Sequence, residues 1–492
     1  MIALSHAALS RLPGEVAVPA YDRRALRAGI VHIGVGNFHR THQAVYVDDC
    51  LHRPGNEAWG ICGIGLTDGP AARAKADAYR AQDGLYTVSE FAPDGTAKTR
   101  VIGAMVDYLH APADPEAVLA RLAHPNTRIV TLTITEGGYN IGETDGRFML
   151  DTPEVAHDLG AGPPRSVFGF LVEALARRRA AGLPAFTIAS CDNLRGNGDT
   201  ARRAVVSFAQ ARDRDLAEYI DREVDFPNSM VDRIAPQIPE AERQALNALS
   251  GVDDRLPAKA ESFNQWVVED SFRQGRPPLE EIGVEFRDDV AAYVSVKGRM
   301  INACHMLLAY PSVLMGRRLV HEGMRDPRMV ALLGAFLDRD VIPHVTSPPG
   351  LKLDRYKGMI VERFSNPAIG DQLLRVAGDG AAKLPIFHGK TIATLVAAGA
   401  DLRREAFLLA CFARYLEGRD DTGTDFPVVE PGLTPDDWAE ARAEPAGVLR
   451  MAPFSALGLA DHRGFRAAFD PMAGDLARQG TSKTLDALVG QD

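Results

Sequence analysis

The chain has 492 residues, more than one compact hydrophobic core accommodates, so two domains or more are expected. Its formal net charge of -10 argues against nucleic-acid and anionic-membrane partners, because binding phosphates requires a basic excess. The five cysteines are scattered without a C-x-x-C pair, which predicts reduced thiols and excludes a disulfide framework or a structural zinc site.

The N-terminus lacks a basic segment followed by a long apolar stretch, so no signal peptide is predicted. No run approaches the roughly 20 apolar residues that span a bilayer. The best candidate, 301–315, is interrupted by His305 and Pro311. We therefore expect a soluble, cytoplasmic protein.

Short apolar runs bounded by turn residues alternate with helical patterns in the first half of the chain. This alternation predicts an α/β fold, with a doubly wound parallel sheet covered by helices on both faces. Asp114 followed by Pro115 is typical of a helix start. The predicted strands are 30–35, 60–66, 128–135 and 185–190, and the helices between them include 115–122 and 167–179.

Helical periodicity dominates from about residue 287, after a last strand-like run at 284–286. The predicted helices are 296–308, 329–337, 391–398, 405–416 and 435–443. We therefore place a domain boundary near residue 285, between an α/β domain over 1–285 and a mainly α-helical domain over 286–492.

The first predicted strand runs into a glycine turn that opens a helix. Glycine has no Cβ, so backbone N–H groups there can approach a pyrophosphate, which the helix dipole also favours. His39 replaces the third glycine of the usual motif, so the turn alone also fits any α/β protein. His39 and Arg40 would add donors beside the anion. The residues predicted to bind a dinucleotide here are Gly34, Gly36, Asn37, Phe38, His39 and Arg40.

Asp68 follows the second predicted strand. An acidic group at this place accepts hydrogen bonds from the adenosine ribose hydroxyls and repels a 2′-phosphate. No lysine or arginine follows until Arg73. Asp68 therefore favours NAD over NADP, although an aspartate in a surface turn would look the same.

Lys297, Asn302 and His305 lie on one predicted helix that Lys297 begins. Asn302 and His305 share a face, and Lys297 is about 12 Å of axial rise from His305. Oxidation of an alcohol by hydride transfer needs a base for the hydroxyl proton and neutral donors for the developing alkoxide. A lysine with a lowered pKa and an asparagine amide supply these. Taken alone, the segment fits a solvated lysine and a hydrogen-bonded core histidine better.

Several segments in chain order resemble the polyol-specific long-chain dehydrogenases, the mannitol 2-dehydrogenase family. They are IVHIGVGNFHRTHQAVY, TLTITEGGY, SCDNLRGNG, FPNSMVDRIAP and K-x-x-x-x-N-x-x-H at Lys297, and 370–383 continues the match. The resemblance implies an NAD-binding Rossmann domain, then a helical domain, with the substrate held between them. It also implies a metal-free oxidation of a polyol to a ketose.

The resemblance also implies a role for individual residues. These are general base for Lys297, oxyanion donors for Asn193 and Asn302, and substrate-hydroxyl contacts for Asp232, His305, Arg375 and Lys383. Asn193 would equally suit an Asx turn, and Asp232 could pair with Arg233. Some relatives carry a glutamate three residues before the lysine that helps to move protons to solvent. Val294 occupies that place here, so a proton path must use other groups or water.

Three other interpretations fit parts of the chain. Tyr293-x-x-x-Lys297 matches the short-chain dehydrogenase pair, although that pair normally lies nearer the glycine turn, within a single domain. His39 and His42 have the spacing of metal ligands, but no cysteine pair or nearby carboxylate completes a zinc site. A non-catalytic dinucleotide-binding regulator would need the glycine turn but not the base and oxyanion residues.

The resemblance leaves the substrate open. D-mannitol to D-fructose is the first expectation, D-arabinitol to xylulose the second, and a fructuronate- or tagaturonate-type hexuronate reductase the third. A uronate needs a site for its carboxylate, for which Arg375 is the one strong candidate. We expect NAD and a polyol or ketose as ligands, and no metal, nucleic acid, membrane or obligatory protein partner.

Overall fold

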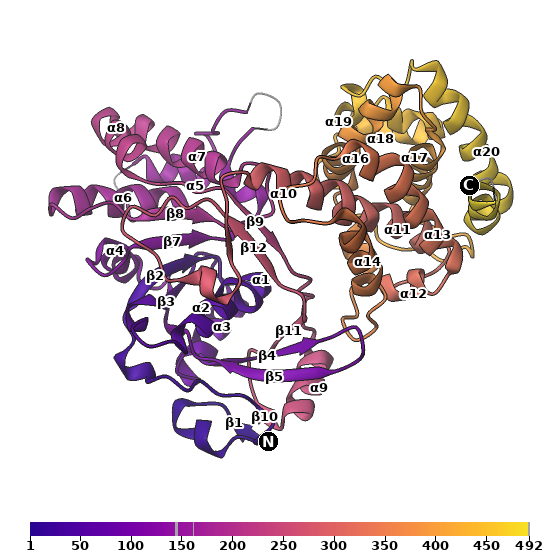
Figure 1. Cartoon of the computed structure of the whole chain (residues 1–492). Coiled ribbons are helices and arrows are strands. Elements are labelled where there is room, and N and C mark those ends of the chain that lie inside the picture. Colours follow the sequence, from indigo (N-terminus) through magenta and orange to yellow (C-terminus); the bar gives the residue numbers. More distant parts are fainter. Residues whose placement is uncertain (143–145, 161, 491–492) are drawn as a thin grey trace. The chain divides into compact units, whose positions relative to one another are not determined.

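A five-stranded parallel sheet forms the centre of the first half of the chain (Figure 1). In spatial order its strands are β6 (Met105–His110), β3 (Gly60–Gly65), β2 (Ala28–Ile33), β7 (Ile129–Leu132) and β8 (Thr187–Ser190). The first of these strands in the chain, β2, is in the middle, and the order of the strands reverses beside it. This is the topology of dinucleotide-binding α/β domains, and it confirms the predicted doubly wound sheet.

Helices cover both faces of this sheet, as Figure 1 shows. Side chains of β2 alternate between the faces, so that Val31 and Ile33 join one apolar cluster and Ile30 joins another. The first cluster contains α4 (Pro115–Ala123), α6 (Val167–Ala180), α7 (Asn197–Arg212) and α8 (Arg214–Glu223), and the second contains α2 (Gln43–Leu51) and α3 (Pro70–Ala81). Asp114 caps α4 as predicted, accepting a hydrogen bond of 2.9 Å from the Ala117 amide.

Of the smaller strands of the first half, only β13 (Glu285–Phe286) falls on a predicted strand-like run, that at 284–286. The smaller strands form three further sheets: β4 (Tyr86–Phe91) with β5 (Ala97–Ile102) and β11 (Ala258–Glu261); β9 (Ser229–Asp232) with β12 (Gln265–Val268) and β13; and β1 (Ile2–Ala3) with β10 (Val252–Asp253). This half also contains α1 (Asn37–Thr41), α5 (Pro153–Asp158) and α9 (Glu240–Ser250). Several of these pairings join segments far apart in the chain, so local sequence patterns carry little signal for them.

The second half is helical, and no strand follows β13 in the part of the chain that the structure describes. Its helices are α10 (Val290–Lys297), α11 (Ala303–Leu314), α12 (Val320–Met324), α13 (Pro327–Ala335), α14 (Leu353–Phe364), α15 (Leu373–Ala377), α16 (Gly380–Ala398), α17 (Arg403–Tyr415), α18 (Pro435–Ala443), α19 (Ala452–Ser455) and α20 (Arg463–Val489). They share one large apolar core of their own. The predicted change from α/β to helical character is therefore confirmed.

This computed structural model describes residues 1–142, 146–160 and 162–490. The chain divides into two compact units, one of Met1–Ala92 with Thr96–Ala291 and the other of Pro93–Gly95 with Ala292–Asp492. Each unit has its own hydrophobic core, as expected for a chain of this length. None of the described helices is both long and apolar enough to cross a membrane.

Candidate functional site

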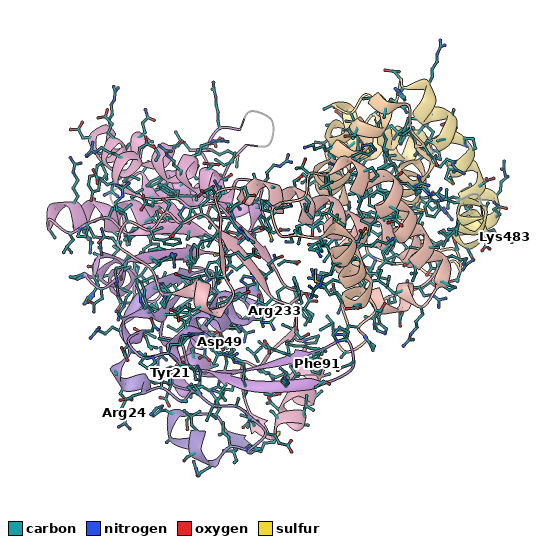
Figure 2. All side chains as sticks on the ribbon, viewed as in Figure 1. Tyr21, Arg24, Asp49, Phe91, Arg233 and Lys483 are labelled. Atoms are coloured by element: carbon teal, nitrogen blue, oxygen red, sulfur yellow. The ribbon has the colours of Figure 1, made fainter. Side chains whose placement is uncertain are left out.

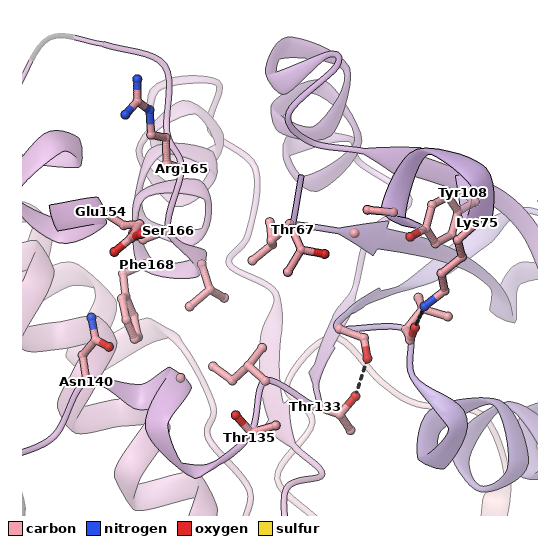
Figure 3. A pocket seen from close by; sticks show the side chains of 18 residues that line it. Thr67, Lys75, Tyr108, Thr133, Thr135, Asn140, Glu154, Arg165, Ser166 and Phe168 are labelled. Atoms are coloured by element: carbon pink, nitrogen blue, oxygen red, sulfur yellow. Dashed lines mark hydrogen bonds between the residues drawn. The ribbon is translucent and has the colours of Figure 1, made fainter. Parts of the chain in front are cut away.

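A pocket of about 470 Å³ opens at the carboxyl ends of β2, β3 and β7 in the first unit (Figure 3). Ligands of doubly wound sheets bind at this edge, next to the point where the strand order reverses. Three segments that follow these strands line the pocket, together with α3 and the start of α6. The lining residues include Gly34, Val35, Gly65, Thr67, Lys75, Tyr108, Thr133, Thr135, Ser166 and Phe168.

The glycine turn after β2 forms one wall of this pocket. Gly34 has a φ of +96°, which favours glycine, and a Cβ at this position would lie 2.1 Å from the Thr133 carbonyl oxygen. The Thr133 hydroxyl donates a hydrogen bond of 2.7 Å to the Gly34 carbonyl. Gly36 then caps α1 (Asn37–Thr41). Apart from the buried Val35, the turn therefore has no side chain, and such a turn allows a pyrophosphate to approach the backbone.

His39 lies in the interior of the unit instead of in the pocket wall. Its ring is fully buried and stacks on His32 with the ring centroids 3.5 Å apart. Burial lowers the pKa of His39 well below its ordinary value, so the ring is neutral. The predicted contribution of His39 to an anion site is therefore restricted to its backbone.

The other side chains of α1 also have partners within the unit. Arg40 donates to the Leu256 carbonyl at 2.6 Å and to the Asn37 side-chain oxygen at 2.5 Å. The Asn37 amide donates to the Pro236 carbonyl at 2.9 Å, and Phe38 stacks on the His42 ring. These contacts anchor the first turn of α1, so that its backbone N–H groups have a fixed direction.

Asp68 follows β3 and is exposed, which fits both a ribose contact and an aspartate in a surface turn. Its carboxylate accepts a hydrogen bond of 2.6 Å from the Gly69 amide, which fixes the side chain on its own turn. An Arg73 nitrogen lies 3.5 Å from the same carboxylate. A basic group is therefore close to Asp68, so that the local charge is more balanced than the sequence alone indicates.

Lys75 on α3 is a pocket residue that the sequence reasoning missed. Its side chain is one of those that line the pocket in Figure 3, and its ammonium group donates to the Val35 carbonyl in the glycine turn. Burial, with the nearby Arg40 as a smaller cause, lowers the pKa of Lys75 to about 8. Lys75 lies in the second turn of α3, well after the end of β3. No local motif therefore connects it to the glycine turn.

The segment after β8 contains a buried residue with a structural role, Asp192, directly before an exposed one, Asn193. Asp192 is buried and accepts hydrogen bonds from the Ile134 and Thr135 amides at 3.0 and 2.9 Å, and from the Tyr139 hydroxyl at 2.7 Å. These bonds fix the segment that follows β7. Asn193, the next residue, is exposed at the carboxyl edge of the sheet, where a substrate could reach its side chain.

Asn197, in the same motif, is fully buried and closes the turn that leads into α7. Its amide nitrogen donates to the Ser190 and Asp192 carbonyls at 3.2 and 3.0 Å. The motif therefore combines one accessible asparagine with two structural residues, Asp192 and Asn197, that hold the segment around it.

Asp232 is the last residue of β9 and is buried to 5% exposure. Its neighbour Arg233 has a fully buried side chain that donates to the Glu261 carbonyl at 3.0 Å and forms an ion pair with Glu90 at 2.5 Å. Figure 2 shows Arg233 in this part of the first unit. Arg233 thus has a structural role of its own, in addition to any contact with Asp232.

Lys297 is at the end of a helix, whereas the sequence interpretation placed it at the beginning. The helix starts at Val290, and a π-helical turn of residues Gly298–Asn302 joins α10 to α11. The Ala303 amide donates to the Gly298 carbonyl, five residues back. In a regular α-helix, residues five apart point about 140° away from one another. The wider turn brings Lys297 and Asn302 closer to one face, which is a common use of π-helical turns at functional sites.

The three residues of this constellation differ in exposure. Lys297 is 8% exposed, while Asn302 and His305 are half-buried. The His305 ring stacks on Phe364 of α14 at a centroid distance of 4.0 Å. The structure therefore places a buried amine, an amide and an oriented imidazole along one helix.

Arg375 and Lys383 lie in neighbouring helices of the second unit. Arg375 forms a bidentate ion pair with the buried Asp371, with contacts of 2.6 and 2.8 Å from one terminal nitrogen. Lys383 donates to the Gly378 carbonyl at 2.6 Å. Arg375 is therefore held by a residue just before α15, and Lys383 by the segment that joins α15 to α16.

Glu430 fixes the first turn of α16, the helix that carries Lys383. Its two carboxylate oxygens accept hydrogen bonds from the Gly380 and Ala381 amides at 2.8 and 2.9 Å. Burial raises the pKa of Glu430 to about 7, with Asp379 as a further cause, while the two amides and Lys383 oppose the shift.

This shift predicts how Glu430 affects stability as the pH changes. Between pH 4.5 and about 7, the folded protein keeps a proton on Glu430 that the unfolded chain, with the ordinary pKa of 4.5, has lost. The contribution to stability is thus present below pH 4.5 and lost as the pH rises through 7. We expect the unfolding free energy of wild type to fall relative to Glu430→Gln by up to about 3 kcal/mol between pH 5 and pH 8. Urea titrations at both pH values measure this, and a constant difference would contradict it.

One cluster of potential metal ligands is present among the described residues. Ligand atoms of Asp48, Asp49 and His52 lie within 4.8 Å of one another. Arg100 contacts both carboxylates, at 2.8 and 2.6 Å, and the Tyr21 hydroxyl donates to Asp48 at 2.6 Å. These partners identify the cluster as a structural ion-pair network. The zinc interpretation had invoked a different pair, His39 and His42.

Comparison with known families accounts for both units. Residues 28–281 match the mannitol dehydrogenase Rossmann domain, and residues 289–471 match the mannitol dehydrogenase C-terminal domain. The chain belongs to the mannitol dehydrogenase family. The predicted resemblance and the predicted fold class are therefore both confirmed.

Relatives of this family are similar to the chain over nearly its whole length. A polyol:NADP oxidoreductase of Gluconobacter oxydans (strain 621H) is 48% identical over 86% of this chain and 87% of its own. The structure of Pseudomonas fluorescens mannitol 2-dehydrogenase, in a ternary complex with NAD and D-mannitol, is 41% identical, with a TM-score of 0.91 and full coverage of both chains. A D-sorbitol dehydrogenase in substrate-free form is 42% identical, with a TM-score of 0.91, over 99% of this chain and 100% of its own.

Proposed function

We propose that this member of the family catalyses the NAD-dependent, metal-independent oxidation of a polyol to a ketose, with D-mannitol to D-fructose as the first candidate. The observation that carries the proposal is the placement of Lys297, Asn302 and His305 along one helix by a π-helical turn. The full-length likeness to a mannitol 2-dehydrogenase in complex with NAD and D-mannitol supports it.

The pocket of the first unit fits a dinucleotide. Gly34 and Gly36 have no side chain to block a pyrophosphate, and the anchored first turn of α1 presents backbone donors beside them. Asp68 would accept hydrogen bonds from the adenosine ribose, and Lys75 would offer a positive charge next to the turn. A nicotinamide cofactor supplies the acceptor for the hydride that leaves the alcohol carbon.

The chain's own residues would handle the proton and the developing negative charge. The neutral amine of Lys297 accepts the proton of the substrate hydroxyl, and a buried position favours this uncharged form. The side-chain amides of Asn302 and Asn193 donate to the oxygen on which negative charge develops. Asp232, His305, Arg375 and Lys383 hold the remaining hydroxyls. Since Val294 carries no titratable group, the proton leaves Lys297 through water or another side chain.

The environment of Arg375 favours a neutral polyol over a uronate. Its guanidinium already forms a bidentate pair with Asp371, so most of its charge is compensated. A substrate carboxylate would have to compete with this buried aspartate. We therefore rank D-mannitol first, D-arabinitol next and hexuronates last.

A panel of polyols and uronates with NAD and NADP, with reduced cofactor as the readout, tests this proposal. We expect the highest kcat/KM with NAD and D-mannitol, and unchanged activity after exhaustive chelation. Loss of activity on chelation that Zn²⁺ restores would contradict the metal-free mechanism. Binding of NAD without oxidation of any polyol would instead indicate a dinucleotide-binding regulator.

Asp68 is expected to set the preference for NAD. In the variant Asp68→Ser, the like charge that repels a 2′-phosphate is absent, and Arg73 no longer has a carboxylate partner. We expect the ratio of kcat/KM with NADP to that with NAD to rise at least tenfold, which corresponds to about 1.4 kcal/mol. Steady-state kinetics with both cofactors measure the ratio.

The double variant Asp68→Ser/Arg73→Ala is the matched control for this prediction. It lacks the basic group as well, so the gain with NADP should be smaller. If kcat/KM of wild type were equal with NADP and with NAD, Asp68 would not determine the cofactor preference. The 48% identical polyol:NADP oxidoreductase makes this comparison informative.

A further inference from the structure

A buried histidine and glutamate support the helix that carries Lys297. His388 on α16 and Glu405 on α17 are 0% and 1% exposed. The His388 Nδ1 atom lies 3.1 and 2.9 Å from the two carboxylate oxygens of Glu405, and its Nε2 atom lies 3.1 Å from the Ala303 carbonyl oxygen. The imidazole therefore connects α17 to the main chain of the catalytic helix.

Ala303 is the residue at which the π-helical turn ends. Its amide donates to Gly298 in the π pattern, and its carbonyl oxygen accepts from His388. A carbonyl oxygen can only accept, so the Nε2 atom of His388 carries a proton. The carboxylate of Glu405 holds Nδ1 and prevents the ring from turning away. Glu405 and the Ala303 carbonyl together therefore fix the orientation of the His388 ring.

A second contact attaches the π-helical turn to α16. Arg299, inside the turn and 4% exposed, donates to the Thr391 hydroxyl at 3.1 Å and to the His344 carbonyl at 2.8 Å. Thr391 is on the same helix as His388, three residues further on. The turn is therefore held at both of its ends by polar contacts.

The register of this turn matters for Lys297. Relative to an α-helix, a π-helical turn contains one extra residue, which corresponds to about 100° of rotation about the helix axis. If the turn relaxed to α geometry, Lys297 would rotate by this amount relative to Asn302 and His305. Interactions that hold the turn therefore decide whether the three side chains face one substrate.

We propose that His388, held by Glu405, is a positioning residue that fixes the π-helical turn and with it the placement of Lys297 relative to Asn302. His388 touches neither substrate nor cofactor in this role. The inference rests on the proposed function for its catalytic consequence, whereas its structural part concerns the turn alone.

The variant His388→Leu tests the proposal by activity. We expect kcat for polyol oxidation to fall about 10- to 100-fold, because a displacement of about 1 Å of a catalytic group has effects of this size. The Kd for NAD, measured without substrate, should change less than twofold. Since this variant leaves Glu405 buried without its partner, His388→Leu/Glu405→Leu is made as well. In Glu405→Gln the ring keeps a hydrogen-bonding partner at Nδ1, so this variant should retain most of the wild-type kcat.

Hydrogen exchange gives a readout that does not depend on activity. We expect faster exchange of the backbone amides of 299–307 in His388→Leu and in the double variant, relative to the rest of the unit. The control is Leu395→Ala, which creates a cavity. Leu395 is buried in the same helix but forms no polar contact with the turn. This variant should lower stability while leaving kcat and local exchange near the wild-type values.

The outcomes distinguish this inference from the proposed function. If wild type oxidises no polyol, the proposed function fails, and the exchange of the 299–307 amides still decides whether His388 holds the turn. If His388→Leu keeps its kcat, or loses local protection no more than Leu395→Ala does, the positioning role of His388 is contradicted.

Discussion

Replacing Lys297 by alanine should lower kcat for polyol oxidation by about 10²- to 10⁴-fold, the range for loss of a general base. Without the amine, no positioned group takes the proton of the hydroxyl as the hydride leaves. Binding of NAD should be retained, because the glycine turn and the pocket beside it belong to the first unit. In wild type we expect log kcat to rise with pH through one apparent pKa, and this dependence should be absent in Lys297→Ala.

Two variants serve as controls for the Lys297 experiment. Lys483 on α20 is exposed, as Figure 2 shows, so Lys483→Ala should retain the wild-type kcat. Tyr293 is buried, and its hydroxyl donates to the Pro349 carbonyl at 3.3 Å. If Tyr293→Phe abolished turnover while Lys297→Ala kept an appreciable rate, the base would be the tyrosine, as in the short-chain dehydrogenases.

Replacing Asn302 by alanine should lower kcat by about 10²- to 10³-fold, with a small change in KM. A neutral donor aimed at a developing oxyanion is worth about this much in the transition state and little in the ground state. Stopped-flow measurement of reduced-cofactor formation separates the chemical step from product release. Asn302→Asp should be slower still, because a carboxylate beside the alkoxide repels the charge that the amide stabilises.

A rise in KM with an unchanged kcat in Asn302→Ala would contradict this assignment, because it would mean that Asn302 binds ground state and transition state equally. The same split should hold for Asn193→Ala, at a position that is exposed after β8. Asn197→Ala is the contrasting case. Since Asn197 is fully buried and supports the turn, we expect its substitution to lower stability first.

Much of the architecture could be predicted from local patterns. The four predicted strands of the large sheet are buried runs with β-branched residues, and such runs pair wherever helices can cover them. The cap of α4 was equally local, since Asp114 and Pro115 act on neighbouring backbone groups. The sheets built from β4, β9 and β11 were not predicted, because their pairing depends on segments that meet only in the folded chain.

The site shows the same division at the level of single residues. The glycine turn was predictable because a positive φ and a close backbone approach both exclude a Cβ at Gly34. The burial of His39 was not predictable, because it depends on how α1 packs against β2, where the His39 ring stacks on His32. Lys75 was missed for the same reason, because only the packing of α3 brings its ammonium group to Val35.

Lys297 itself illustrates both sides. The sequence by itself determined the family, the presence of a lysine, an asparagine and a histidine in one helical segment, and the glycine turn upstream, because these depend on residue identity and spacing. The tertiary structure alone decided that the helix begins at Val290 and contains a π-helical turn at 298–302. Groups about 90 residues further along the chain, among them His388 and Thr391, form hydrogen bonds with residues in and next to that turn, and no local pattern records such contacts.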